Sequence, residues 1–152
     1  MSAKSIHLNA SMECWDEFIA FIDEVCATTD LSSTKSYRLK LAAEELLSNI
    51  VRSSESNCEA TGLLSSLELS SRVVIEKDSH SLEVLFSDNA PQFDPQFDQR
   101  DTPSHIEHHV SARPIGGLGL YLVQDSVDAI SYEFVDGRNR YMLMMELEPI
   151  PQ

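Results

Sequence analysis

The hydrophobic positions at the start of this chain repeat with two periods. Residues 4–10 alternate Ile6 and Leu8 with polar neighbours, as a short, half-buried strand does. After Ser11, an expected N-cap, hydrophobic residues recur every three or four positions until about residue 28. This spacing predicts an amphipathic helix that follows the strand directly.

A second helix is expected after the serine-rich cluster at 32–34, continuing through residue 54, with a loop over 55–62. On a helical wheel, its hydrophobic residues gather on one face, which we expect to be buried. These residues are Leu39, Ala42, Ala43, Leu46, Leu47 and Ile50.

The second half of the chain changes from strand to helix and back to strand. Residues 67–78 and 81–87 predict an antiparallel pair joined by a polar turn region at 78–80. Helical spacing returns from Gly117 to about Val127, and residues 128–148 predict a hairpin that turns at the sequence DGRN.

Composition and charge narrow the class of protein. The chain has 152 residues, enough for one well-packed domain spanning 1–152. Its net charge of -14 argues against direct binding to nucleic acid or to an anionic membrane. We expect a cytoplasmic protein, because no segment has the hydrophobic length of a membrane span or of a secretory signal. Three cysteines without a CxxC pair indicate neither a disulfide framework nor a cysteine zinc site.

Two polar residues on the second predicted helix suggest chemistry. Glu45 and Asn49 lie one turn apart at the edge of the hydrophobic face, and asparagine is a mediocre helix former. A carboxamide oxygen can bind Mg²⁺, and a carboxylate can orient or deprotonate an attacking hydroxyl or water. The two side chains either act together on a phosphate ligand or belong to an ordinary solvated helix edge.

Glycines concentrate directly before the last predicted helix. Gly116, Gly117 and Gly119 are three of only five glycines and flank Leu118 in the stretch RPIGGLGLYLV. Without Cβ atoms, backbone N–H groups at a helix N-terminus can converge on an anion. The stretch indicates either a phosphate-binding loop or a tight turn, and it matches neither the P-loop nor the dinucleotide-binding fingerprint.

A third candidate ends a predicted strand. Asp88 follows SLEVLFS directly and begins the turn DNAPQFDP. There it can accept a hydrogen bond from an amino group of a bound base, or it can form an Asx turn with its own backbone.

Taken in order, EELLSN, DNAPQFDP and GGLGLYLV…VDAISYEFVDGRNRYMLMMEL resemble the N, G1 and G2 boxes of the GHKL ATP-binding superfamily. Within it, the chain is most similar to the bacterial anti-sigma-factor serine/threonine kinases, and the resemblance covers nearly the whole chain. It implies the α+β Bergerat fold, a two-layer α/β sandwich. In that fold a mixed, mostly antiparallel sheet is covered by helices on one face.

By position, the resemblance makes Glu45 the catalytic carboxylate, Asn49 the Mg²⁺ ligand, Asp88 the adenine anchor and residues 95–115 the ATP lid. It implies ATP and Mg²⁺ as cofactors. It also implies a sigma factor and a STAS-type anti-anti-sigma protein as partners, and a possible homodimer. The nucleotide-binding residues that it implies are Asn49, Asp88, Ala90, Phe93, Gly116, Gly117, Leu118 and Gly119.

Two positions depart from the family pattern. Ala90 replaces a glycine, which matters if the backbone there needs a positive φ, and Ser53 stands where a histidine is common. The sequence therefore leaves two functions open, a Mg-ATP-dependent serine/threonine kinase and a non-catalytic protein-sequestering module with weak or no nucleotide binding. An ATP hydrolase is a third reading.

Three histidines fall within the expected lid. His105, His108 and His109 offer imidazole ligands, but a mobile lid is a poor coordination cage. We therefore do not expect a zinc site there.

Overall fold

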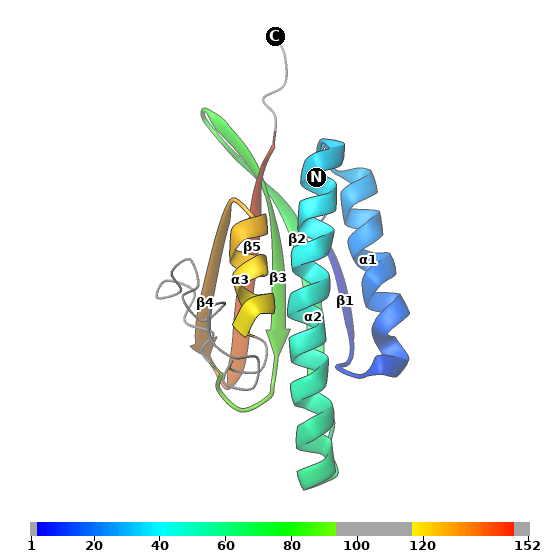
Figure 1. The fold of residues 1–152 in the computed structure, drawn as a ribbon. Coiled ribbons are helices and arrows are strands. Elements are labelled where there is room, and N and C mark those ends of the chain that lie inside the picture. The colour runs from blue at the N-terminus through cyan, green and yellow to red at the C-terminus, as the bar shows by residue number, and fades with distance from the viewer. Residues whose placement is uncertain (1–2, 94–116, 148–152) are drawn as a thin grey trace.

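Helices and one sheet form two layers, with the helices gathered on one face of the sheet (Figure 1). The computed structural model describes residues 3–93 and 117–147. The elements in this part of the chain are β1 (Lys4–Asn9), the 3-10 helix η1 (Met12–Cys14), α1 (Trp15–Thr28), α2 (Ser33–Thr61), β2 (Ser66–Glu76), β3 (Ser79–Asp88), α3 (Gly117–Ser126), β4 (Ala129–Val135) and β5 (Arg138–Leu147).

The five strands pair in the order β1-β2-β3-β5-β4. The predicted α+β sandwich is confirmed, but we expected some parallel pairing, and every pairing between the described strands is antiparallel. The reason lies in the position of β5. It runs between β3 and β4 and is antiparallel to both. Strands β3 and β4 therefore share a direction but are not neighbours.

The core lies between the helices and the covered face of the sheet, and α2 supplies much of it. All six hydrophobic residues predicted for the buried face of α2 are buried. Alternate residues of β3 and β5 meet them, among them Phe86 and Leu143, which are both 0% exposed. Burial of each such side chain contributes about 1.5–3 kcal/mol to stability. This packing fixes α2 against the ends of β3 and β5.

Helix α2 is longer than the sequence indicated. The loop expected over 55–62 is wrong, because α2 continues to Thr61 and ends at Gly62. Gly62 has a left-handed backbone with φ of 80°, and its N–H donates to the Cys58 carbonyl at 2.7 Å. A glycine in this conformation is a common helix stop, so Gly62 was the available signal.

The helix starts also differ in detail. Ser11 precedes η1 rather than α1, and its hydroxyl makes no capping hydrogen bond. Ser32 caps α2, since its hydroxyl accepts a hydrogen bond from the Lys35 N–H at 3.1 Å. The third predicted helix is confirmed as α3.

Both predicted hairpins are confirmed. The β2–β3 pairing extends to Glu76 opposite Ser79, so the turn is tighter than the expected region 78–80. The β4–β5 turn is formed by Asp136 and Gly137, with φ values of 54° and 76°. Positive φ at both central residues is what a two-residue type I′ turn requires.

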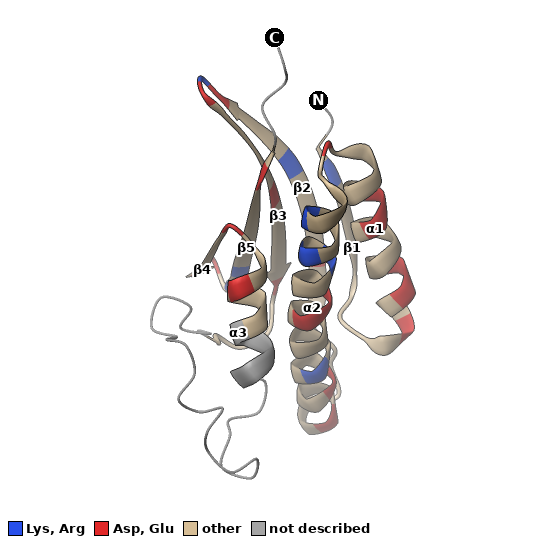
Figure 2. Cartoon of the chain, turned by 45° about the horizontal axis from the view of Figure 1, so that its top comes forward, with Lys and Arg blue, Asp and Glu red and all other residues tan. Residues whose placement is uncertain are grey.

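Charge is unevenly distributed over the helices (Figure 2). Helix α1 carries four acidic residues and no lysine or arginine, whereas α2 carries both signs. Lys40 of α2 forms an ion pair with Asp23 of α1 at 2.6 Å. Among the described helices, none has the length and hydrophobicity needed to cross a membrane.

Candidate functional site

A cavity of about 280 Å³ lies between α2 and the ends of β3 and β5. Its volume is close to the lower end of the range for small-ligand sites. Four of the predicted site residues line it, namely Asn49, Asp88, Ala90 and Phe93. The fold therefore brings together residues that the sequence separates by about 40 positions.

A larger hollow of about 460 Å³ lies on the opposite face of the sheet. Its charged residues include Arg72 and Glu83, which are joined by an ion pair at 2.7 Å. None of the predicted site residues lines this hollow. We therefore place the candidate site in the smaller cavity, where the polar groups converge.

Asp88 ends β3 and is only 2% exposed. Its Oδ1 accepts hydrogen bonds from the Ala90 N–H at 3.0 Å and from Nδ2 of Asn139 at 2.9 Å. The bond to Ala90 is the Asx turn that the sequence left open. Burial raises the pKa of the Asp88 carboxyl, while the hydrogen bonds from Asn139 and Ala90 and the nearby Arg138 charge act in the opposite direction.

Asn139 is a site residue that the sequence analysis missed. It lies directly opposite Asp88 on β5 and is 1% exposed. Besides Asp88, its Nδ2 donates to the Ala90 and Pro91 carbonyls, both at 3.1 Å. Its Oδ1 accepts from the Phe93 N–H at 2.9 Å and from the Tyr132 hydroxyl at 2.6 Å.

One signal could have found Asn139. The buried positions of β5 alternate, and the next three on the same face are Tyr141, Leu143 and Met145. A carboxamide that begins a row of buried apolar and aromatic side chains must find partners, because an unpaired buried polar group costs about 1–3 kcal/mol. Most of its hydrogen-bond partners here lie in the turn that follows β3.

The turn after β3 tolerates Ala90 without strain. Among the described residues other than glycine, only Asp136 has a positive φ, so Ala90 has a negative one. The glycine common in the family is thus not required here for backbone conformation. Phe93, whose N–H donates to Asn139, is 50% exposed and lines the cavity.

Glu45 and Asn49 lie one turn apart on α2, as predicted, but they differ in their relation to the cavity. Asn49 lines it and donates from Nδ2 to the Glu45 backbone carbonyl at 2.8 Å. This bond occupies the amide nitrogen and leaves the hard Oδ1 atom for a ligand. Glu45 is partly exposed and is not among the residues that line the cavity.

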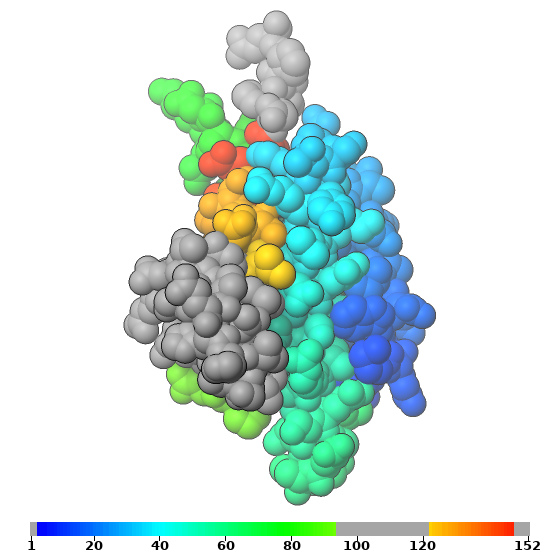
Figure 3. All heavy atoms as spheres, viewed as in Figure 1, coloured from blue at the N-terminus to red at the C-terminus, as the bar shows by residue number. Residues whose placement is uncertain are grey.

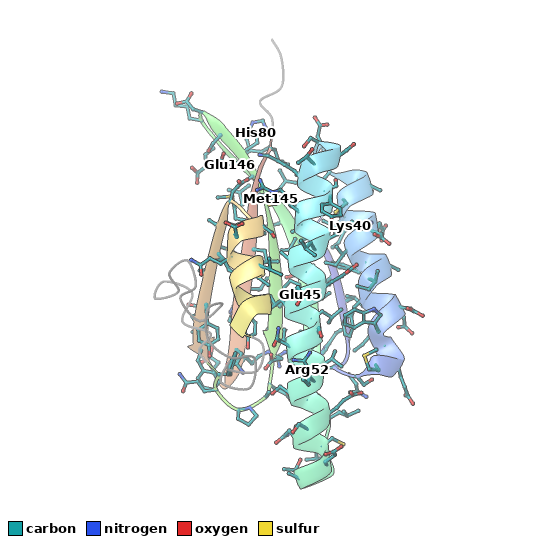
Figure 4. The ribbon with its side chains drawn as sticks, viewed as in Figure 1. Lys40, Glu45, Arg52, His80, Met145 and Glu146 are labelled. Atoms are coloured by element: carbon teal, nitrogen blue, oxygen red, sulfur yellow. The ribbon has the colours of Figure 1, made fainter. Side chains whose placement is uncertain are left out.

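Arg52 is a second residue that the sequence analysis missed. It lies on α2, where Figure 4 labels it, one turn after Asn49. Arg52 also lines the cavity. Its guanidinium donates to the Ser48 hydroxyl at 3.3 Å and forms no ion pair with another described residue. A guanidinium at the cavity favours an anionic ligand such as a phosphate group.

The glycine-rich stretch is described only in part. Gly117, Leu118 and Gly119 form the first turn of α3, which packs beside α2 on the side opposite α1 (Figure 3). Gly116 lies outside the described residues, and so do the expected lid at 95–115 and the three histidines within it. The role of these residues remains a prediction.

The donor set of the cavity fits a magnesium nucleotide. A buried carboxylate and a short apolar turn meet at the strand ends, and a carboxamide oxygen and a guanidinium line the α2 side. Comparison with known families agrees with this chemistry. The family model of the histidine kinase-like ATPase domain matches residues 8–145. No curated protein matches the chain significantly.

Proposed function

Because this chain belongs to the family of histidine kinase-like ATPase domains, which bind ATP, we propose that it is an anti-sigma regulatory factor. In this proposal it acts as a Mg-ATP-dependent kinase on a serine or threonine of a STAS-type anti-anti-sigma partner. The observation that carries the proposal is the meeting of Asn49 and Asp88 in one cavity.

The strand end of the cavity recognises the base in this proposal. Asp88 supplies an acceptor for an exocyclic amino group, and Ala90 and Phe93 supply apolar surface beside it. The buried position of Asp88 strengthens such a hydrogen bond, because little water competes for the carboxylate.

The α2 side of the cavity carries the phosphate and the metal. Oδ1 of Asn49 would hold Mg²⁺, which when bound neutralises phosphate charge. Arg52 adds a second positive charge at the cavity. Glu45, one turn earlier on α2, would orient the hydroxyl of the partner and accept its proton. Positioning and charge then supply most of the catalysis.

One observation favours a second function. Glu45 does not line the cavity, although Asn49 does. A domain that binds ATP without a carboxylate in reach of the phosphates would act as a protein-sequestering module. In that alternative, the nucleotide would serve only to shape the surface that binds the partner.

Labelled phosphate transfer separates the two functions. The purified chain is mixed with Mg-ATP labelled at the γ-phosphate and with a candidate STAS-type protein. The kinase proposal expects label on the STAS protein, and a decrease of about 10²–10⁴-fold in Glu45→Gln, as is typical for loss of a general base. Complex formation should be unchanged.

Glu44→Gln is the matched control, because Glu44 is the exposed neighbour of Glu45 on the same helix and loses the same charge. Label transfer by this variant should match that of the wild type. A stable complex with no transfer by the wild type would contradict the kinase proposal and support sequestration.

A further inference from the structure

Asn139 donates a hydrogen bond to one oxygen of the Asp88 carboxylate. Given nucleotide binding in the cavity, on which this inference rests, we propose that Asn139 makes the site selective for adenine over guanine. It does so by occupying one oxygen of the Asp88 carboxylate.

The Oδ1 atom of Asp88 has no capacity left for a ligand. A carboxylate oxygen has two lone pairs, and Oδ1 accepts one hydrogen bond from Nδ2 of Asn139 and one from the Ala90 N–H. Their lengths of 2.9 Å and 3.0 Å are those of good N–H···O bonds. Oδ2 accepts no hydrogen bond from any residue that the structure describes. It is the oxygen left for a ligand in the cavity.

One free oxygen suits adenine and not guanine. The edge of adenine offers a single amino group, which needs one acceptor. Guanine offers two adjacent donors, its ring N–H and its 2-amino group, and a carboxylate binds such a pair best with both oxygens, as it binds arginine. When Oδ1 is occupied, guanine must leave one donor without a charged partner in a largely buried site, which costs affinity.

Asn139 acts through Asp88 and is therefore a positioning residue. Its own polar atoms are already used, since Nδ2 donates to Asp88, Ala90 and Pro91 while Oδ1 accepts from Phe93 and Tyr132. At 1% exposure it offers no surface to a ligand. The same side chain also closes the turn after β3, so the carboxylate always has one oxygen occupied while the turn is intact.

The ratio of ATP to GTP affinity tests the role of Asn139. Asn139→Leu keeps a similar side-chain volume and removes the donor, which frees one lone pair of Oδ1. We expect the GTP dissociation constant to improve relative to that of ATP by about 10-fold, the effect of one hydrogen bond to a charged group. Loss of structure alone would weaken both nucleotides together and leave the ratio unchanged, which would overturn the inference.

Tyr132→Phe is the matched control for this variant. It removes the hydroxyl that binds Oδ1 of Asn139 and leaves the bond from Nδ2 to Asp88 in place. The ATP to GTP ratio of this variant should equal that of the wild type. A shift as large as that of Asn139→Leu would overturn the inference.

A third test compares nucleotide affinities of the wild type alone, so it does not depend on the folding of a variant. Inosine triphosphate is GTP without the 2-amino group. If Asp88 has only one free oxygen, the 2-amino group of guanine finds no carboxylate partner and adds no affinity. GTP should therefore bind no more tightly than inosine triphosphate. Binding of GTP that is tighter by about 10-fold would show two available oxygens and overturn the inference. Absence of ATP binding would overturn the nucleotide site itself, whereas ATP binding with the wrong preference overturns the role of Asn139 alone.

Discussion

The two ends of the cavity hold their polar side chains in different ways. At the strand end, Asp88 and Asn139 are 2% and 1% exposed and are joined to the turn after β3 by a closed set of hydrogen bonds. At the helix end, Asn49 is partly exposed and Arg52 is exposed, and both lie on α2. Among the residues that the structure describes, the Asn49 side chain bonds only to its own helix.

In the proposed nucleotide site, this difference means that the part that recognises the base is already formed before the ligand binds, whereas the part that holds the phosphates is completed by the ligand. Buried polar groups need fixed partners, so the strand end is rigid in the absence of nucleotide. Side chains on an exposed helix edge have water as an alternative partner, so they can reorient when phosphate and metal bind. Removing a polar side chain at the strand end should therefore lower ATP affinity more than removing one at the helix end.

The largest effect on ATP affinity is expected for Asp88→Asn. The amide loses the charge, and one of its two ends can no longer accept a hydrogen bond from the base. ATP affinity should fall by about 10- to 100-fold, which calorimetric titration measures. Asp78→Asn, in the exposed turn between β2 and β3, is the matched control and should bind ATP normally. Equal affinity of Asp88→Asn and the wild type would remove Asp88 from the site.

The pH dependence of stability provides a second test of the strand end. Burial raises the pKa of Asp88 in the folded protein above its value in the unfolded chain. Its contribution to stability is therefore complete below the ordinary aspartate pKa of about 4 and is lost as the pH rises through the raised pKa. Relative to Asp88→Asn, which does not titrate, the free energy of unfolding of the wild type should decrease from about pH 4 towards neutral.

Urea denaturation of the two proteins across this pH range measures the difference. Because every other carboxylate is present in both proteins, their titrations cancel in the comparison. Parallel stability curves would mean that Asp88 titrates as an exposed aspartate does, contrary to its burial.

A smaller effect is expected at the helix end. Arg52→Gln removes an exposed charge that water and salt already screen. ATP affinity should fall by about 2- to 5-fold at low salt, and the difference should shrink as salt is added. Arg38→Gln, an exposed arginine on α2 away from the cavity, is the control. A loss as large as that of Asp88→Asn would refute the contrast between the two ends.

The smallest effect is expected for Ala90→Gly. Ala90 has a negative φ, so glycine relieves no strain and only adds freedom to the unfolded chain. Stability should fall by about 0.4–1 kcal/mol, measured by thermal or urea denaturation. ATP affinity should change little. A large gain in affinity would show that the Cβ of Ala90 obstructs the base.

Periodicity predicted most of the fold. It gave the buried face of α2, all three α-helices and both hairpins of the described chain, because burial imposes a regular pattern on helices and strands. It missed the last turns of α2, where residues 55–61 have no hydrophobic period and the helix is stopped by Gly62. The resemblance, in turn, led us to expect some parallel pairing, whereas the described strands pair only antiparallel, since strand order depends on contacts between distant segments.

The site was predicted less completely than the fold. Asn49 and Asp88, which line the cavity, were singled out because each stands at a position that its element does not explain, a helix edge and a strand end. Asn139 was missed because its role depends on β5 lying beside β3, and this pairing is not visible in a single sequence. Arg52 was missed for a similar reason, since only packing shows which surface arginine lines a cavity.

The central claim is that Asn49 and Asp88 belong to one magnesium nucleotide site. Calorimetric titration of the wild type and of Asn49→Ala with ATP and ADP, each with and without Mg²⁺, tests it most directly. We predict micromolar binding that depends on magnesium in the wild type and loses that dependence in Asn49→Ala. Absence of binding at millimolar ATP by a folded sample, or an unchanged magnesium dependence in the variant, would contradict the claim.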